Sequence, residues 1–193
     1  MLIGIMAFPL FLLAFLIFAP IIFLTDRGPV FYNAERLGKN GKRFKMYKFR
    51  SMFVNAPDIR LKDGSTYNGE NDPRVTKIGR VLRRTSIDEL PQILNVINGT
   101  MSLIGPRPNL PPKEGETLSR LEQRRLEVKP GITGYNQAYF RNSVSAEERY
   151  VNDVYYVDHL SFGLDVRVFF RTIKCVLKKE NINIQEEKKE IAG

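Results

Sequence analysis

The chain begins with a long run of apolar positions. Residues 2–24 contain no charged side chain, and lysine and arginine become frequent between Arg27 and Arg50. As a helix, the apolar run would measure roughly 34 Å, while the hydrocarbon core of a bilayer is about 30 Å thick. The basic residues that follow predict that the rest of the chain stays on the cytoplasmic side. We therefore expect residues 1–25 to form a membrane anchor.

Two prolines, Pro9 and Pro20, lie inside this apolar run. Proline removes a backbone hydrogen bond and bends a helix. The segment is therefore either a plain transmembrane helix or a helix that breaks at Pro9 or Pro20 and turns back. A secretory signal peptide is less consistent with the pattern, because no basic residue precedes the run and no small-residue cleavage site lies before Asp26.

The next pattern is typical of β-strands. Residues 29–32 and 44–50 are rich in aromatic residues, and the Asn-Gly dipeptide at 40–41 suits a type I′ turn. A β-hairpin is predicted here. Lys48 and Arg50 lie two positions apart, so on a strand they would share one face. That face could hold a diphosphate, or it could be a solvated edge that discourages aggregation.

Helical spacing of apolar residues dominates the rest of the chain. It predicts helices over residues 76–84, from about 88 to 97, over 111–128, from 145 onward and over 161–178. Residues 54–73 predict a loop, and residues 179–193 a charged tail. The expected fold is α+β, with a membrane-embedded N-terminal helix, a small β-hairpin and a compact set of amphipathic interfacial helices. Residues 26–178 would form one catalytic domain at the membrane interface.

The composition narrows the class of partner. The 193 residues carry a formal net charge of +9, so the partner is expected to be anionic: phospholipid, nucleotide, lipid phosphate or nucleic acid. Cys175 is the single cysteine and His159 the single histidine. This excludes an internal disulfide framework and a metal site built from several cysteines.

The candidate chemistry centres on Asp88 and Glu89. They lie between the arginine pair at 83–84 and a Gly-Pro-Arg-Pro turn at 105–108. At a helix start, backbone N–H groups favour a carboxylate or a bound phosphate. Adjacent helical side chains point about 100° apart, so one acid could face a reacting phosphorus and the other a metal or a proton. The alternative is ordinary capping, since Ser86 and Glu89 have capping-box spacing.

Arg107 lies between two prolines that fix the backbone on either side of it. A guanidinium presented this way can bind phosphate oxygens with two parallel hydrogen bonds, and it stays protonated. A structural turn with an exposed arginine is the alternative interpretation.

The string from 83 to 108, read with Lys-Phe-Arg-Ser-Met at 48–52 and Pro-Gly-Ile-Thr-Gly at 130–134, resembles the bacterial sugar transferase family, the monotopic phosphoglycosyl transferases. The resemblance runs from about residue 28 to about residue 178. It implies a re-entrant anchor bent at a proline and a catalytic domain on the cytoplasmic face of the bacterial inner membrane. The chain departs from the family pattern in the short arms around its prolines and in Phe140, where a glycine is usual before the arginine; the latter bears on sugar choice.

The resemblance also implies a reaction. A sugar-1-phosphate would pass from a UDP-sugar to polyprenyl (undecaprenyl) phosphate, releasing UMP and initiating glycoconjugate or polysaccharide assembly. Asp88 would attack the phosphorus next to the sugar, and Mg²⁺ would neutralise the diphosphate. Glu89 would be a base or, with Asp88, a metal ligand. The implied phosphate-binding residues are Arg107 and, as weaker candidates, Lys48, Arg50, Arg84 and Arg141.

Two alternatives stay open at this point. The net charge would also suit a membrane-anchored basic scaffold or nucleic-acid-binding protein without catalysis, although the sequence contains no recognisable nucleic-acid module or aromatic stacking platform, so we expect no nucleic-acid partner. The chain could also be the catalytic part of a larger polymer-initiating protein. No pattern favours one sugar or one oligomeric state.

Overall fold

The computed structural model describes residues 2–59, 67, 69, 72–140 and 143–177. In chain order its elements are α1 (Leu2–Asp26), β1 (Phe31–Leu37), the 3₁₀ turn η1 (Lys39–Gly41), β2 (Arg43–Phe49), α2 (Lys77–Thr85), the 3₁₀ turn η2 (Ile87–Glu89), α3 (Gln92–Ile97), β3 (Ser102–Ile104), α4 (Arg120–Arg125), β4 (Gly131–Thr133), α5 (Tyr135–Tyr139), α6 (Ala146–Asp158) and α7 (Phe162–Leu177). The predicted α+β class is confirmed. The predicted tail, residues 179–193, lies outside the described residues.

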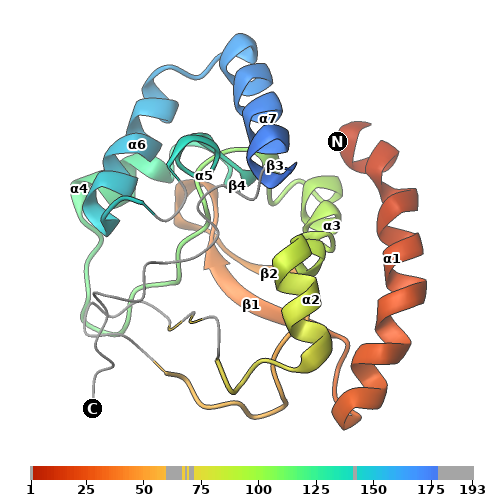
Figure 1. The fold of residues 1–193 in the computed structure, drawn as a ribbon. Helices are drawn as coiled ribbons and strands as arrows, with labels where there is room; N and C mark the ends of the chain where they lie inside the picture. The colour runs from red at the N-terminus through yellow and green to blue at the C-terminus, as the bar shows by residue number, and fades with distance from the viewer. Residues whose placement is uncertain (1, 60–66, 68, 70–71, 141–142, 178–193) are drawn as a thin grey trace.

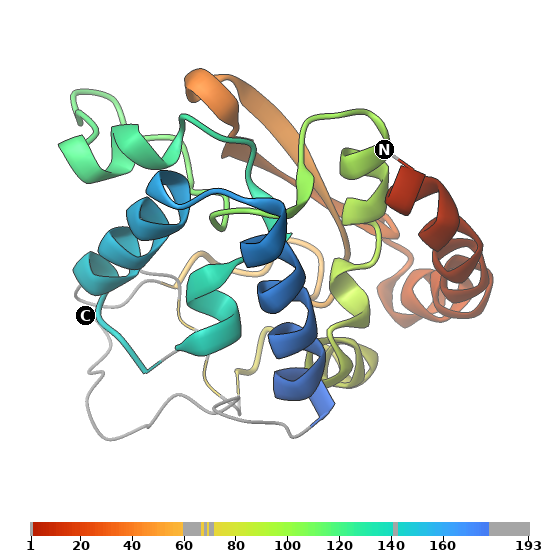
Figure 2. The same ribbon diagram turned by 90° about the horizontal axis from the view of Figure 1, so that it is seen from above.

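The elements are arranged around the hairpin and the short β3–β4 pair in the middle of the molecule (Figure 1). Helix α1 lies at one side, next to α2 and α3, and helices α4 and α6 lie at the other. The view from above shows the same order, with α7 and α5 between the two groups (Figure 2). The acid pair predicted from the sequence lies between α2 and α3, and the residues on either side of it, Ile87 and Leu90, pack against a core cluster that includes residues of α1.

Helix α1 continues through both of its prolines, so neither Pro9 nor Pro20 ends it. Within the described part of the chain, α1 is the helix that is long and apolar enough to cross a membrane, judged by length and composition. The predicted break of the helix at Pro9 or Pro20 is therefore not observed. A re-entrant path through the membrane and a plain transmembrane path both stay predictions.

One face of α1 packs on the domain along most of the helix. Near its middle, the Phe11 ring stacks on Phe49 and the Phe15 ring on Phe31, with centroids 6.3 and 5.6 Å apart. The opposite face is apolar but exposed, through residues that include Met6, Leu10, Leu13, Leu16, Ile17, Phe23 and Leu24. An apolar surface of this extent is typical of a contact with lipid or with another protein. The domain therefore lies beside the apolar helix instead of at its end.

The β1–β2 hairpin confirms the predicted turn. The strands pair antiparallel from Phe31 opposite Phe49 to Leu37 opposite Arg43. In the turn, Asn40 and Gly41 have φ values of 58° and 73°, the positive angles that a type I′ turn requires. The turn matters for the site because it fixes the strand register, and the register decides which face each β2 side chain occupies.

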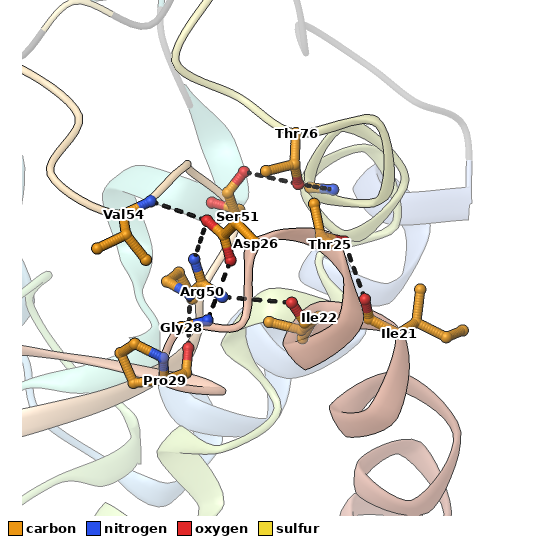
Figure 3. Close-up of polar contacts among 11 residues, drawn as sticks. Ile21, Ile22, Thr25, Asp26, Gly28, Pro29, Arg50, Ser51, Val54 and Thr76 are labelled. Carbon is orange, nitrogen blue, oxygen red and sulfur yellow. Dashed lines mark hydrogen bonds and ion pairs between the residues drawn. The ribbon is translucent and has the colours of Figure 1, made fainter.

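The strand pattern predicted that Arg50 and Lys48 share one face of the strand, and this prediction is wrong. Strand β2 ends at Phe49, and the Arg50 side chain is buried at the C-terminal end of α1 (Figure 3). Its Nη1 lies 2.5 Å from Asp26 Oδ2, Nε donates to the Pro29 carbonyl at 2.5 Å, and Nη2 donates to the Ile22 carbonyl at 3.2 Å. Arg50 therefore satisfies the end of α1, where carbonyl groups lack helical partners and favour a cation.

The Arg50→Met variant is expected to lose roughly 2–3 kcal/mol of unfolding free energy, because a partly buried carboxylate and two carbonyls lose their partner. The matched control is Arg43→Met, whose ion pair with Glu35 spans 3.6 Å between exposed side chains and should contribute under about 1 kcal/mol. Denaturant unfolding of both variants in detergent measures the difference. Equal losses in the two variants would contradict the capping role.

The β3–β4 pair was not predicted, because residues 130–134 have the composition of a loop. The two strands run parallel, with Ser102 opposite Gly131 and Ile104 opposite Thr133. The backbones approach so closely that a Cβ on Gly131 would lie 2.2 Å from the Gly105 nitrogen. Glycine is therefore required at this crossing. The pair fixes the start of the Gly-Pro-Arg-Pro turn that carries Arg107.

The long helix predicted over residues 111–128 is wrong. Its helical part is α4, which begins after Ser119 with a capping box formed by Ser119 and Glu122. The residues before it contain Pro111, Pro112 and Gly115, and Gly115 has a φ of 83° that no helix contains. By contrast, the predicted capping box at Ser145 and Glu148 is present and starts α6.

Candidate active site

The acid pair lies in a tight 3₁₀ turn, where the sequence predicted the N-terminus of an α-helix. Helix α2 ends at Thr85, and the left-handed backbone of the next residue, Ser86 (φ 57°, ψ 17°), redirects the chain into η2. Helix α3 starts later, at Gln92, after Pro91. The capping-box alternative is also wrong, because the Ser86 side chain makes no capping hydrogen bond.

Glu89 is held by two cations from distant parts of the chain. Lys48 Nζ donates to Glu89 Oε1 at 2.7 Å, and Arg107 Nη2 donates to the same oxygen at 3.2 Å. Burial would raise the pKa of Glu89, but Lys48 and Arg107 outweigh it and hold the pKa at about 2. Glu89 is therefore a carboxylate at neutral pH, paired with a lysine from β2 and an arginine from the turn after β3.

Asp88 has the opposite environment. Its side chain is 9% exposed, and within the described part of the chain no hydrogen bond or ion pair engages its carboxylate. Burial raises the pKa of Asp88 to about 6, and the charge of Glu89 adds to this, while Lys48, Arg83 and Arg107 oppose it. Two adjacent carboxylates thus have pKa values far apart, a pattern that often marks catalytic acids and nucleophiles.

Two side chains that support this site were not singled out from the sequence. Asn95, buried on α3, accepts from the Tyr47 backbone N–H at 3.0 Å and donates to the Lys45 carbonyl at 2.8 Å, which ties β2 to the helix that follows the acids. Arg83 is half-buried, donates to Ser51 Oγ at 2.9 Å and interacts electrostatically with Asp88. The signal for Asn95 was a polar residue inside an otherwise apolar helical pattern.

The structure therefore brings together four of the predicted residues, Asp88, Glu89, Lys48 and Arg107. It does not bring Arg50 to them, for the reason given above. Arg84 is exposed on α2, and in the described residues no hydrogen bond or ion pair links it to either acid. Its neighbour Arg83 is the arginine of α2 that interacts electrostatically with Asp88. Arg141 lies outside the described residues.

A buried acid with a raised pKa beside an acid paired with cations is a pattern that often marks an enzyme active site. Comparison with known proteins identifies the family. The model of the bacterial sugar transferase family matches residues 1–179, and the chain belongs to that family. The resemblance noted from the motifs is thereby confirmed.

Individual relatives are similar over most of this chain. The galactosyl transferase CpsE of Streptococcus agalactiae is 44% identical over 161 residues, 79% of this chain and 35% of its own length. The uncharacterized sugar transferase EpsL of Bacillus subtilis is 44% identical over 162 residues, 84% of this chain and 77% of its own. The UDP-galactose-lipid carrier transferase of Erwinia amylovora is 40% identical over 173 residues, 83% of this chain and 36% of its own. The chain thus spans about a third of the length of two of these relatives.

Proposed function

We propose that this protein transfers a sugar-1-phosphate from a UDP-sugar to polyprenyl phosphate, with release of UMP. The observation that carries the proposal is the environment of the two acids: Asp88 is buried without a hydrogen bond or ion pair to any described residue, next to a cation-bound Glu89 and beside an apolar helix. Family membership supports it, as does the name of the Erwinia relative, which specifies UDP-galactose and a lipid carrier. The catalytic domain would act on the cytoplasmic face of the bacterial inner membrane, in contact with anionic phospholipid.

In the first step, an Asp88 carboxylate oxygen would bond to the phosphorus next to the sugar. The phosphoanhydride bond would break, its electron pair leaving with UMP, and a covalent phosphosugar aspartate would remain. In the second step, an oxygen of polyprenyl phosphate would attack the same phosphorus, and the Asp88 carboxylate would leave. The described residues donate no hydrogen bond to the Asp88 carboxylate, which supports this role, because a carboxylate oxygen without a hydrogen bond is the better nucleophile.

The cations would stabilise the phosphates during both steps. Phosphoryl transfer depends mainly on positioning and on neutralising negative charge. Lys48 and Arg107 already meet at the Glu89 carboxylate, so a diphosphate that enters there would find charged donors from two separate elements. Arg107 is 51% exposed, so a substrate can reach its guanidinium where it lies, whereas Lys48 is 17% exposed.

Mg²⁺ fits this site as a proposed cofactor. No cluster of three or more acidic, histidine or cysteine side chains is present among the described residues. Mg²⁺ does not need one, because it commonly binds one or two carboxylates together with water and substrate phosphates. Asp88 and Glu89 are the residues that would hold it, and when bound it would neutralise the charge of the diphosphate.

The pKa of Glu89 bears on its role. A carboxylate with a pKa of about 2 is a weak base at neutral pH. Between the two roles that the sequence left open, proton acceptor and metal ligand, this environment favours cation binding. Its pairing with Lys48 and Arg107 also orients both cations toward the place where phosphate would bind.

The pH dependence of the reaction follows from Asp88. If this carboxylate is the nucleophile, its ionised form is required, and the free enzyme loses that form as the pH falls through about 6. We expect kcat/KM for the UDP-sugar to be constant above about pH 7 and to fall about tenfold per pH unit below about pH 5.5. Initial rates of UMP release from pH 4.5 to 8.5 measure this. A profile without a change of slope in that interval would contradict the assignment.

One experiment tests the reaction as a whole. Membranes that contain the protein are incubated with polyprenyl phosphate, Mg²⁺ and a panel of UDP-sugars, and the release of UMP is measured. Release of UMP with at least one donor, dependent on the lipid phosphate for turnover, is the expected result. UDP as the product, or no nucleotide product with any donor, would contradict a phosphoglycosyl transferase.

A further inference from the structure

A buried ion pair joins α4 to α6 on the side of the molecule away from α1. Arg125 Nη2 lies 2.6 Å from Asp153 Oδ2, and the two side chains are 4% and 1% exposed. The Arg125 guanidinium also lies over the Tyr150 ring, 4.7 Å from its centre. Helices α4 and α6 lie side by side in both views (Figures 1 and 2). Arg125 is thus held from two positions on α6.

The same arginine contacts the backbone of the active-site turn. Arg125 Nη2 also donates to the main-chain carbonyl of Arg107 at 2.8 Å. Pro108 follows directly and restricts the backbone of Arg107 further. The main chain of Arg107 is therefore fixed from the protein interior, while its side chain points outward to Glu89 at 3.2 Å. A path of direct contacts leads from Asp153 through Arg125 and Arg107 to the acid pair.

A contribution to stability alone is a weak explanation for the buried ion pair between Arg125 and Asp153. Burying two charges costs desolvation, and such pairs often contribute little net stability. Burial raises the pKa of Asp153 in spite of Arg125 beside it, which reflects that cost. The same two helices are already joined by an ion pair between Arg124 and Asp158, both largely exposed. That second pair does not contact the Arg107 carbonyl, so the two pairs differ in their relation to the site.

We propose that Arg125, held by Asp153, is a positioning residue that fixes the Arg107 guanidinium at Glu89. Its effect on catalysis rests on the proposed function, because Arg107 would bind a substrate phosphate. Its effect on the contact between Arg107 and Glu89 does not depend on the proposed function. Arg125 itself would touch neither substrate.

A double-mutant cycle on UMP release tests the catalytic part. Arg125→Met is expected to lower kcat/KM for the UDP-sugar roughly 10- to 100-fold, because a misplaced group loses much of its catalytic effect. In an Arg107→Ala background the same change should have less than about a twofold further effect. The control Arg124→Met, on the same helix, should change the rate less than about twofold. Effects of Arg125→Met and Arg107→Ala that multiply in the double variant would overturn the proposal.

NMR of the arginine side chains tests the positioning without any activity. The Nε–H signal of Arg107, assigned by its loss in Arg107→Ala, reports how the guanidinium is held beside Glu89. Arg125→Met should shift this signal toward that of a freely moving arginine, and Arg124→Met should leave it unchanged. An unchanged Arg107 signal in folded Arg125→Met protein would overturn the proposal. If wild-type protein releases no UMP, the proposed function fails, and this measurement still decides the positioning role.

Folding is checked in each variant by circular dichroism. Should Arg125→Met fail to fold, Asp153→Asn takes its place in both measurements, since asparagine keeps the shape of the side chain and removes its charge. The expected results are the same in direction, because Arg125 loses the partner that holds it. A folded Asp153→Asn protein with wild-type rates and a wild-type Arg107 signal would overturn the proposal.

Discussion

The Asp88→Asn variant is expected to release no UMP above background, a loss of at least about 1,000-fold, because an amide oxygen cannot form the phosphosugar intermediate. Wild-type and variant proteins are compared with the same UDP-sugar and polyprenyl phosphate. Asp158→Asn, which removes an exposed acid from α6, is the matched control and should keep nearly full activity. An Asp88→Asn enzyme with a substantial rate would rule out Asp88 as the nucleophile.

The same variant should be more stable than the wild-type protein at high pH. The pKa of Asp88 lies at about 6 in the folded protein instead of 3.8, so the folded state binds its proton more tightly than the unfolded state does. The stability from that proton is present below about pH 4 and is lost as the pH rises through about 6. The amide of the variant needs no such proton, so the gain should be roughly 3 kcal/mol at pH 8 and near zero at pH 4. Denaturant unfolding at both pH values measures it.

This stability measurement also shows whether a loss of activity in Asp88→Asn comes from a folding defect. An Asp88→Asn protein that is inactive and less stable than wild type at pH 8 would indicate a folding defect, and the loss of activity would then say nothing about chemistry. An inactive and more stable variant is the combination expected of a residue whose environment serves function at the expense of stability.

The Lys48→Met variant is expected to lose activity by at least about 100-fold. Lys48 is the cation nearest to Glu89, at 2.7 Å, and its removal leaves the pair of acids with less compensating charge where a diphosphate must bind. The pKa of Glu89 should rise in this variant, because Lys48 is the largest of the influences that lower it. Measured values of kcat/KM for the UDP-sugar test the first effect and carboxyl NMR the second.

Strand β2 offers a matched control for Lys48. Lys45 lies three positions earlier on the same strand, so its side chain is on the opposite face, and it is exposed. Lys45→Met removes the same charge and should change kcat/KM less than about twofold. Similar losses in the two variants would mean that general positive charge, and not the position of Lys48, supports the reaction.

Local signals in the sequence were the ones that predicted structure well. The Asn40-Gly41 turn and the Ser145 capping box each depend on a few neighbouring residues, and both are present. The apolar helix α1 follows directly from composition. The family motifs were also local strings, and the family match bears out the interpretation drawn from them.

Features that depend on distant contacts were missed or misplaced. The parallel β3–β4 pair forms between segments almost 30 residues apart, and neither segment has a strand-like pattern of its own. Arg50 does not share a face with Lys48, because its side chain binds Asp26 and the end of α1. The alternation of residues along a strand does not indicate such a contact. Tertiary contacts of this kind override local preference.

The sequence predicted which residues the candidate site contains, but not the backbone conformation that carries them. Asp88, Glu89, Lys48 and Arg107 were all singled out, whereas the 3₁₀ turn that carries the acids depends on the left-handed backbone of Ser86, a conformation that serine seldom adopts. The separation of the two acid pKa values depends on which carboxylate Lys48 and Arg107 reach. That choice is decided by β2 and by the turn after β3, both far away in the sequence.

Peptide mass spectrometry is the most direct test of Asp88 as the nucleophile. The protein is incubated with the UDP-sugar that supports UMP release, without polyprenyl phosphate, and then digested. The expected result is a gain of one sugar phosphate on the peptide that contains Asp88, removed when polyprenyl phosphate is added and absent from the Asp88→Asn variant. An adduct on a different residue, or an active enzyme that forms none and releases UMP solely when the acceptor is present, would contradict the two-step mechanism.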